Sequence, residues 1–151
     1  MPMRYKVAHI YKLAVIFHNK NEFNNLIQQM ILFNLTERKK KFELGYGDYR
    51  IYFVGAFSIE NIEQVSINFY EVESGKEIEL KNIGLLGLKP RDFINGEKAI
   101  ACFSFFVEKR TDYIIEINNI ENLQPKKSML FLKNLLFPSK ISIEDLKIAI
   151  K

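Results

Sequence analysis

Short runs of alternating apolar and polar residues, separated by turn residues, are the feature that most limits how this chain can fold. Clear examples are 65–72, 98–107 and 112–118. Ser74-Gly75 predicts a tight turn after the first of them. Alternation with a period of two is typical of strands that bury one face. Short strands broken by turns predict a mainly β fold, an antiparallel β-sandwich in a jelly-roll or immunoglobulin-like arrangement.

One stretch, residues 20–34, has the pattern of a helix instead. Asn19 and Glu22 form a capping-box arrangement before it, and Asn34 is suited to end it in the left-handed conformation. The apolar residues that repeat at helical spacing are Phe23, Leu26, Ile27, Met30 and Ile31. The sequence therefore predicts one amphipathic helix packed against the sandwich.

Length and composition suit one soluble domain spanning 1–151, since 48% of the 151 residues are apolar. The net charge of +4 is mild. A single cysteine excludes an intramolecular disulfide. His9 and Lys12 interrupt the apolar run 7–17, and no run reaches about 18 apolar residues, so neither a signal peptide nor a membrane span is expected. We expect a cytoplasmic location, with attachment to a membrane surface as the alternative.

The most regular local pattern is Phe103-Ser-Phe-Phe-Val107, a charged turn, and Asp112-Tyr-Ile-Ile-Glu-Ile117 before Asn118. Over residues 98–118 it resembles the closing hairpin of GOLD-type β-sandwich domains. In that family a strand with alternating Phe is followed by a turn and a Gly-x-Tyr strand that ends near Asn. Thr111-Asp112 stands here where the family usually has Gly. The resemblance implies a non-enzymatic module that binds proteins or lipids at membranes.

Residues with catalytic potential are few and separated. Cys102 has apolar neighbours on both sides, so we expect an inert core residue with a raised thiol pKa. His9 and His18 lie in or beside a strand predicted over residues 4–17, on opposite faces if that strand is continuous, and have no cysteine or carboxylate cluster nearby. The sequence thus predicts no catalytic site, no metal site and no cofactor. An enzyme whose site is assembled from distant residues is the remaining alternative.

Two pairs of carboxylates flank the predicted turn at Ser74-Gly75. Glu71 and Glu73 precede it, and Glu77 and Glu79 follow it, each pair two residues apart. Paired carboxylates can serve acid–base chemistry. Polar neighbours on both sides of this turn favour a solvated face instead.

The segment 126–137 combines lysines with large apolar residues. Such basic amphipathic segments can lie on an anionic membrane or dock on a partner protein, while the density of apolar side chains also suits a core segment. The candidate interaction residues are Lys126, Lys127, Phe131, Lys133, Leu136 and Phe137. Contact with a protein partner, with a second copy of the chain or with a membrane surface through this segment is the leading hypothesis for a non-enzymatic binding module.

A second candidate surface is the basic run Arg38, Lys39, Lys40 and Lys41, which is followed by Phe42, Tyr46 and Tyr49. Basic residues with nearby aromatic rings can hold single-stranded nucleic acid through phosphate contacts and base stacking. The alternative is a solvated link after the predicted helix, whose C-terminal dipole favours positive charge. Nucleic-acid binding through this run is therefore the second functional hypothesis.

Overall fold

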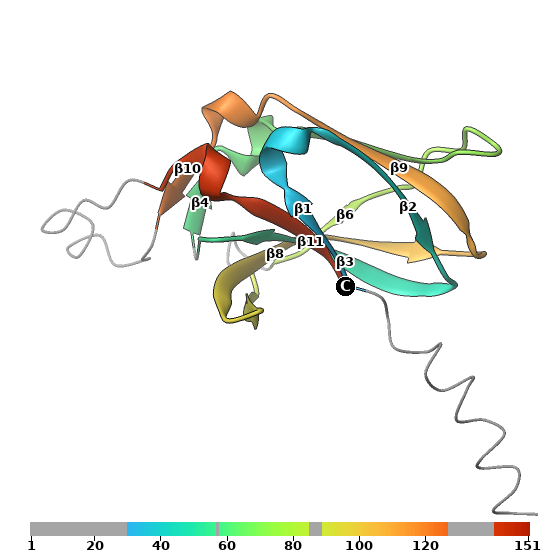
Figure 1. Ribbon diagram of the computed structural model, residues 1–151, viewed down its shortest axis with the longest axis horizontal. Coiled ribbons are helices and arrows are strands. Elements are labelled where there is room, and N and C mark those ends of the chain that lie inside the picture. The colour runs from blue at the N-terminus through green and yellow to red at the C-terminus, as the bar shows by residue number, and fades with distance from the viewer. Residues whose placement is uncertain (1–29, 57, 85–88, 127–140) are drawn as a thin grey trace, which may run out of the picture.

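The structure is a computed structural model that describes residues 30–56, 58–84, 89–126 and 141–151 (Figure 1). Its strands are β1 (Ile31–Asn34), β2 (Lys39–Leu44), β3 (Gly47–Val54), β4 (Ser58–Glu60), β5 (Ser66–Glu71), β6 (Lys81–Asn82), β7 (Arg91–Ile94), β8 (Glu97–Val107), β9 (Thr111–Asn118), β10 (Gln124–Lys126) and β11 (Lys147–Ile150). Four short 3₁₀ helices connect them: η1 (Leu35–Glu37), η2 (Ile62–Gln64), η3 (Ile120–Asn122) and η4 (Ile143–Asp145). The prediction of a mainly β fold is confirmed.

Every strand pairing is antiparallel. A large sheet has the order β1-β11-β3-β8-β6, with β7 also paired to β8. A small sheet has the order β2-β9-β5, and β4 and β10 form a separate ribbon. Residues of both main sheets contribute to one buried cluster, including Phe53 and Phe105 from the large sheet and Phe69 and Ile115 from the small one. The two sheets therefore face each other across a shared core, as Figure 1 shows.

Two chain segments cross together from one sheet to the other. Because β2 pairs with β9 and β3 pairs with β8, residues 39–54 and 97–118 run antiparallel along most of their length. Both segments change sheets at the same end, at Gly45-Tyr46 and at 108–110. The two strands predicted over 98–107 and 112–118 therefore exist as β8 and β9, but they lie in different sheets and do not pair with each other. The resemblance to GOLD-type domains itself stays a prediction.

A hydrogen bond from a tyrosine hydroxyl to the backbone stabilises each of these crossings. The Tyr49 hydroxyl donates to the Gly45 carbonyl and the Tyr113 hydroxyl to the Lys109 carbonyl, both over 3.1 Å and both four residues back. Each tyrosine follows an aspartate and is buried. This is the arrangement of a tyrosine corner in β-sandwiches. The two Asp-Tyr pairs of the sequence thus mark the two equivalent crossings.

At the opposite end, 3₁₀ helices take the place of wide turns. Asn61 and Asn119 adopt the left-handed conformation, with φ of 61° and 60°, just before η2 and η3. Asparagine is one of the few residues that adopt it at modest cost. Asn61 also donates from Nδ2 to the Asn122 carbonyl over 3.1 Å, which joins the two turns. The similar sequences Asn-Ile-Glu-Gln-Val and Asn-Ile-Glu-Asn-Leu therefore form similar structures.

The predicted helix over 20–34 is wrong in its final part. Residues 20–29 lie outside the described residues, and Ile31–Asn34 forms strand β1. β1 pairs with β11, placing Ile31 opposite Ile150 and Phe33 opposite Ile148. Asn34 is extended and begins η1, so it does not end a helix. Pairing with a strand more than a hundred residues away overrides the local helical spacing.

A further hairpin, formed by β7 and β8, follows β6 along the chain. Arg91–Ile94 forms β7, and Asn95 and Gly96, both with positive φ, turn it into β8. Such two-residue turns suit the right-handed twist of paired strands. Ile94 packs on a second buried cluster with Tyr52, Val54 and three alanines, Ala99, Ala101 and Ala149. This hairpin thus covers part of the outer face of the large sheet.

No helix in the described parts of the chain is long and apolar enough to cross a membrane.

Candidate binding site

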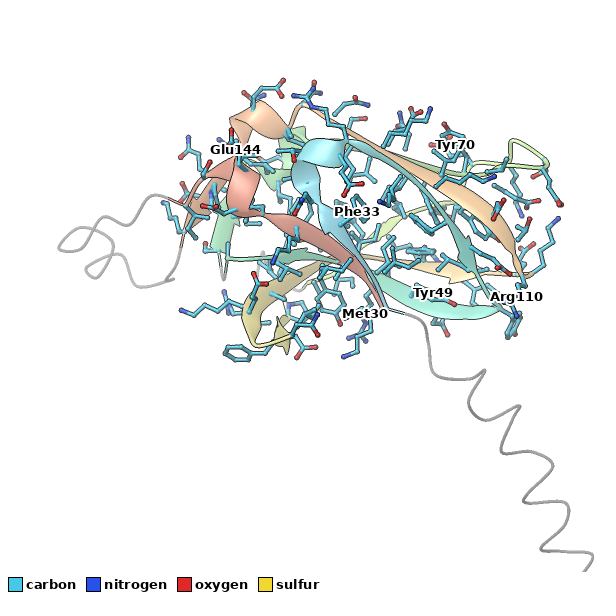
Figure 2. All side chains as sticks on the ribbon, in the orientation of Figure 1. Met30, Phe33, Tyr49, Tyr70, Arg110 and Glu144 are labelled. Carbon is cyan, nitrogen blue, oxygen red and sulfur yellow. The ribbon has the colours of Figure 1, made fainter. Side chains whose placement is uncertain are left out.

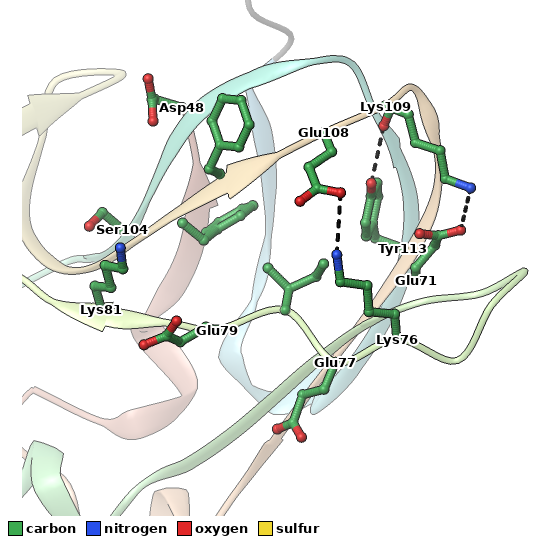
Figure 3. A pocket seen from close by; sticks show the side chains of 13 residues that line it. Asp48, Glu71, Lys76, Glu77, Glu79, Lys81, Ser104, Glu108, Lys109 and Tyr113 are labelled. Carbon is green, nitrogen blue, oxygen red and sulfur yellow. Dashed lines mark hydrogen bonds and ion pairs between the residues drawn. The ribbon is translucent and has the colours of Figure 1, made fainter.

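A hollow of about 340 Å³ lies beside β8, at the side of the molecule where the chain passes from β5 to β6 (Figure 3). Residues 76–78 still pair with β5, since the Ile78 amide donates to the Phe69 carbonyl over 2.7 Å. Further along, Lys81 and Asn82 pair with β8, opposite Ser104 and Phe103, and the Ile83 amide donates to the Cys102 carbonyl over 2.9 Å. The chain between them must bridge the small and large sheets. This bridging segment leaves the hollow between itself and the end of β8.

Charged side chains of both signs line the hollow. The carboxylates are Asp48, Glu71, Glu77, Glu79 and Glu108. The ammonium groups are Lys76, Lys81 and Lys109. Five negative and three positive charges leave an excess of two negative charges. The hollow therefore favours cationic over anionic ligands.

Glu71 is the most deeply buried of these groups, with 5% of its surface exposed. The prediction of a solvated face is wrong for this residue. Glu71 follows Phe69 on the inward-facing side of β5, because side chains two apart in a strand share a face. The alternation of β5 that continues through Glu71 is the sequence signal that could have revealed its burial.

Lys109 supplies most of the charge compensation of Glu71. Its Oε1 atom is buried and accepts no hydrogen bond of good geometry, while Nζ of Lys109 lies 2.7 Å away as an ion pair. The Lys109 ammonium lowers the pKa of Glu71, and the Glu71 carboxylate raises the pKa of Lys109. Lys109 is 55% exposed and also lies 3.7 Å from Glu73. Both members of the pair are thus held in their charged forms.

The pair makes a testable contribution to pH-dependent stability. The depressed pKa of Glu71 stabilises the fold above the ordinary value of 4.5, and this stabilisation disappears as pH falls through the folded-state pKa. Glu71→Gln should therefore be less stable than the wild type at about pH 7, with the difference shrinking towards about pH 3. Urea unfolding at several pH values measures it. Glu73→Gln, an exposed neighbour, is the control, and a pH-independent difference for Glu71→Gln would contradict the assignment.

An exposed aromatic pair forms the outer rim of the hollow. Phe106 lines the hollow and stands opposite Asp48 in the β3–β8 pairing. The ring of Tyr46, from the turn between β2 and β3, meets the Phe106 ring edge to face at 5.1 Å. Tyr46 is 74% exposed and Phe106 43%. Two large rings that contact each other yet remain exposed are an unusual surface feature for a folded domain.

The basic run lies in strand β2 and at its start, where each residue has an acidic partner. The ion pairs are Arg38–Glu121 at 3.8 Å, Lys40–Glu37 at 2.7 Å, Lys41–Asp112 at 2.7 Å and Lys39–Glu116. Two of these partners, Glu116 and Asp112, lie on the neighbouring strand β9. A phosphate bound here would have to compete with carboxylates already in place.

The aromatic residues next to the basic run do not form one platform with it. Tyr49 is buried at the crossing, and the Phe42 ring stacks on the buried Phe69 at 6.0 Å. Tyr46 alone is widely exposed, and it pairs with Phe106. The three aromatic rings that the nucleic-acid hypothesis assigns to base stacking therefore do not form one exposed surface in the structure.

The segment 126–137 is described only at its first residue. Lys126 ends β10 and forms an ion pair with Glu60 on β4. The other candidate residues, Lys127, Phe131, Lys133, Leu136 and Phe137, lie outside the described residues. Contact through this segment therefore stays a prediction.

The single thiol behaves as the sequence indicated. Cys102 is fully buried in the core, and burial raises its pKa to about 12. Its role as a core residue is confirmed. His9 and His18 lie outside the described residues. Within the described ranges, no cluster of three or more His, Cys, Asp or Glu side chains could hold a metal ion.

Comparisons with protein-family models, with curated proteins and with solved structures find no match. The fold and the site define a mainly β protein whose facing sheets carry a charged hollow with an exposed aromatic rim.

Proposed function

We propose that this chain is a non-enzymatic binding module, built on a β-sandwich of jelly-roll type, that contacts a protein partner at the rim of the hollow beside β8. The single observation that carries the proposal is the exposed edge-to-face pair of Tyr46 and Phe106. Aromatic side chains are enriched at the centres of protein interfaces, where their burial supplies much of the binding free energy. Because the two rings already contact each other, they lose less conformational entropy on binding than two separate side chains would.

The charges around the pair favour a protein over a nucleic acid. Carboxylates and ammonium groups alternate around the hollow, with a small negative excess, whereas a nucleic-acid surface needs a positive excess. The most basic run of the chain, Arg38–Lys41, is neutralised by its ion pairs. Charged groups of both signs around an apolar contact are the usual composition of a protein interface.

The state of the Glu71–Lys109 ion pair supports binding over catalysis. A general acid or base works best when its pKa lies near the working pH. Contact with Lys109 moves the pKa of Glu71 down, and contact with Glu71 moves the pKa of Lys109 up, so both shifts lead away from neutrality. The pair is suited to fix charge and shape at the site.

Site-specific photo-crosslinking tests the proposal. We would place a benzoylphenylalanine at Tyr46 and, as a matched control, at Phe93, which is 60% exposed on the β7–β8 hairpin. The expected result is a discrete protein adduct from position 46 that position 93 does not give. An adduct with a second copy of the chain would identify the partner as itself.

The captured protein is then titrated against the purified wild type and the Tyr46→Ala, Phe106→Ser double variant. Loss of two interface aromatics should weaken binding about thirtyfold or more. Equal affinity for both proteins, or adducts with lipid or nucleic acid at position 46, would contradict the proposal.

A further inference from the structure

The edge of β8 beside the hollow has no strand paired to it. On one side, β8 pairs with β3 from Ala99 to Val107. On the other side it pairs with β7 up to Ile100 and with β6 at Phe103 and Ser104. Beyond Ser104, no strand of the described chain pairs with β8 on this second side. The last residues of β8 therefore offer an edge to which another strand can be added.

The backbone groups of Phe106 point towards this edge. Arg50 exchanges two backbone hydrogen bonds with Lys151, of 2.8 and 3.1 Å, on the side of β3 away from β8. Ser104 stands opposite Arg50 in a pair without mutual hydrogen bonds, so its N–H and C=O point towards β6. Two residues further on, the N–H and C=O of Phe106 point the same way. They face the hollow that Phe106 lines.

The charge of the hollow selects the side chains that an added segment can carry. Two of the carboxylates, Glu77 and Glu79 on the bridging segment, form no ion pair with another described residue. Across the hollow, Glu108 pairs with Lys76 at 3.2 Å and Glu71 with Lys109 (Figure 3). A basic side chain entering the hollow would gain charge compensation and would lie near the ring of Phe106.

We infer that the hollow takes an extended, basic peptide segment of the partner, which adds as a strand to β8 at Phe106 and directs an arginine or lysine towards Glu79. This inference rests on the proposed function, because it names the element of the protein partner that the aromatic rim would receive. Strand addition supplies affinity through main-chain hydrogen bonds, and alternate side chains supply specificity. The edge from Phe105 to Val107 is about 10 Å long at about 3.3 Å per residue, enough for about three residues of a peptide.

A labelled heptapeptide that alternates valine and arginine is the probe, with binding measured by fluorescence anisotropy at low salt. Replacing its arginines with glutamates should weaken binding at least tenfold, because the hollow carries a negative excess. Glu79→Gln should weaken binding of the arginine peptide about three- to tenfold. Glu144→Gln is the matched control and should leave affinity unchanged. Glu144 lies at the end of the molecule opposite Arg110, which directly follows Lys109 of the hollow (Figure 2).

Backbone methylation separates strand addition from simple charge attraction. Only alternate amides of an added strand pair with β8, so methylating one alternate set should abolish binding while methylating the other should change affinity less than threefold. Equal effects of both sets, or equal binding of the arginine and glutamate peptides, would overturn the inference. If the peptide fails while a crosslinked partner still requires Tyr46 and Phe106, the inference alone is wrong. If neither dependence is found, the proposed function is wrong as well.

Discussion

Phe69→Ala is expected to lower the free energy of unfolding by about 3–5 kcal/mol, the largest loss of any single substitution considered. Phe69 is fully buried on the small sheet and faces the large one. Its ring contacts those of Phe105 at 4.6 Å, Tyr113 at 5.4 Å and Phe42 at 6.0 Å. Removing the ring leaves a cavity at the point where the two sheets meet, and rigid neighbouring rings cannot move far enough to fill it.

Equilibrium unfolding in urea measures this loss. Phe93→Ala removes the same ring from a side chain that is 60% exposed, and it should cost less than about 1 kcal/mol. A midpoint shift of similar size for the two variants would mean that Phe69 is not the central contact between the sheets. A change in the slope of the transition for Phe69→Ala would point to a less compact folded state.

The strands themselves could be predicted because their signal is local. The runs 65–72, 98–107 and 112–118 correspond to β5, β8 and β9 within about one residue at each end. Each has alternating apolar residues, and that alternation does not depend on which strand it pairs with. The chemistry of Cys102 was predictable for the same reason, since its immediate neighbours already determine its burial.

Strand pairing could not be predicted because it is set by distant residues. Ile31 has helical spacing to its neighbours, yet it pairs with Ile150 at the far end of the sequence. Lys39 belongs to a basic run in the sequence, yet its charge is compensated by Glu116 on another strand. A prediction from local pattern assigns Ile31 to a helix and Lys39 to a free basic surface. Both errors come from contacts that local pattern does not contain.

The candidate site is non-local in the same way. The hollow exists because residues 76–82 leave β5 and join β8, so that Glu79 and Phe106 come to line one space. Neither residue is unusual within its own stretch of sequence. Only the burial of Glu71 was available from the sequence, because it continues the inward alternation of Phe69. A polar residue at an inward position near a strand end is therefore worth examining as part of a site.

Gly55→Ala is expected to lower the free energy of unfolding by about 2–4 kcal/mol, through two separate effects. Gly55 follows β3 with a φ of +109°, which side chains rarely adopt. Its amide donates to the Lys98 carbonyl over 2.7 Å, so the backbone cannot rotate away without losing this bond. A Cβ atom here would lie 3.2 Å from the Asp145 carbonyl oxygen and 3.3 Å from Cδ2 of the fully buried Leu146.

Gly75→Ala separates the backbone effect from the steric one. Gly75 also has a positive φ, +66°, but a Cβ atom there would meet nothing within 4 Å. Its substitution should cost about 1–2 kcal/mol, the usual penalty for a left-handed conformation. The additional loss in Gly55→Ala then reports the close approach of η4 to the end of β3, together with the less favourable φ of +109° at Gly55. If urea unfolding gives equal losses for the two variants, that approach is loose, and the contact between Gly55 and Leu146 does not help to hold β11 against β3.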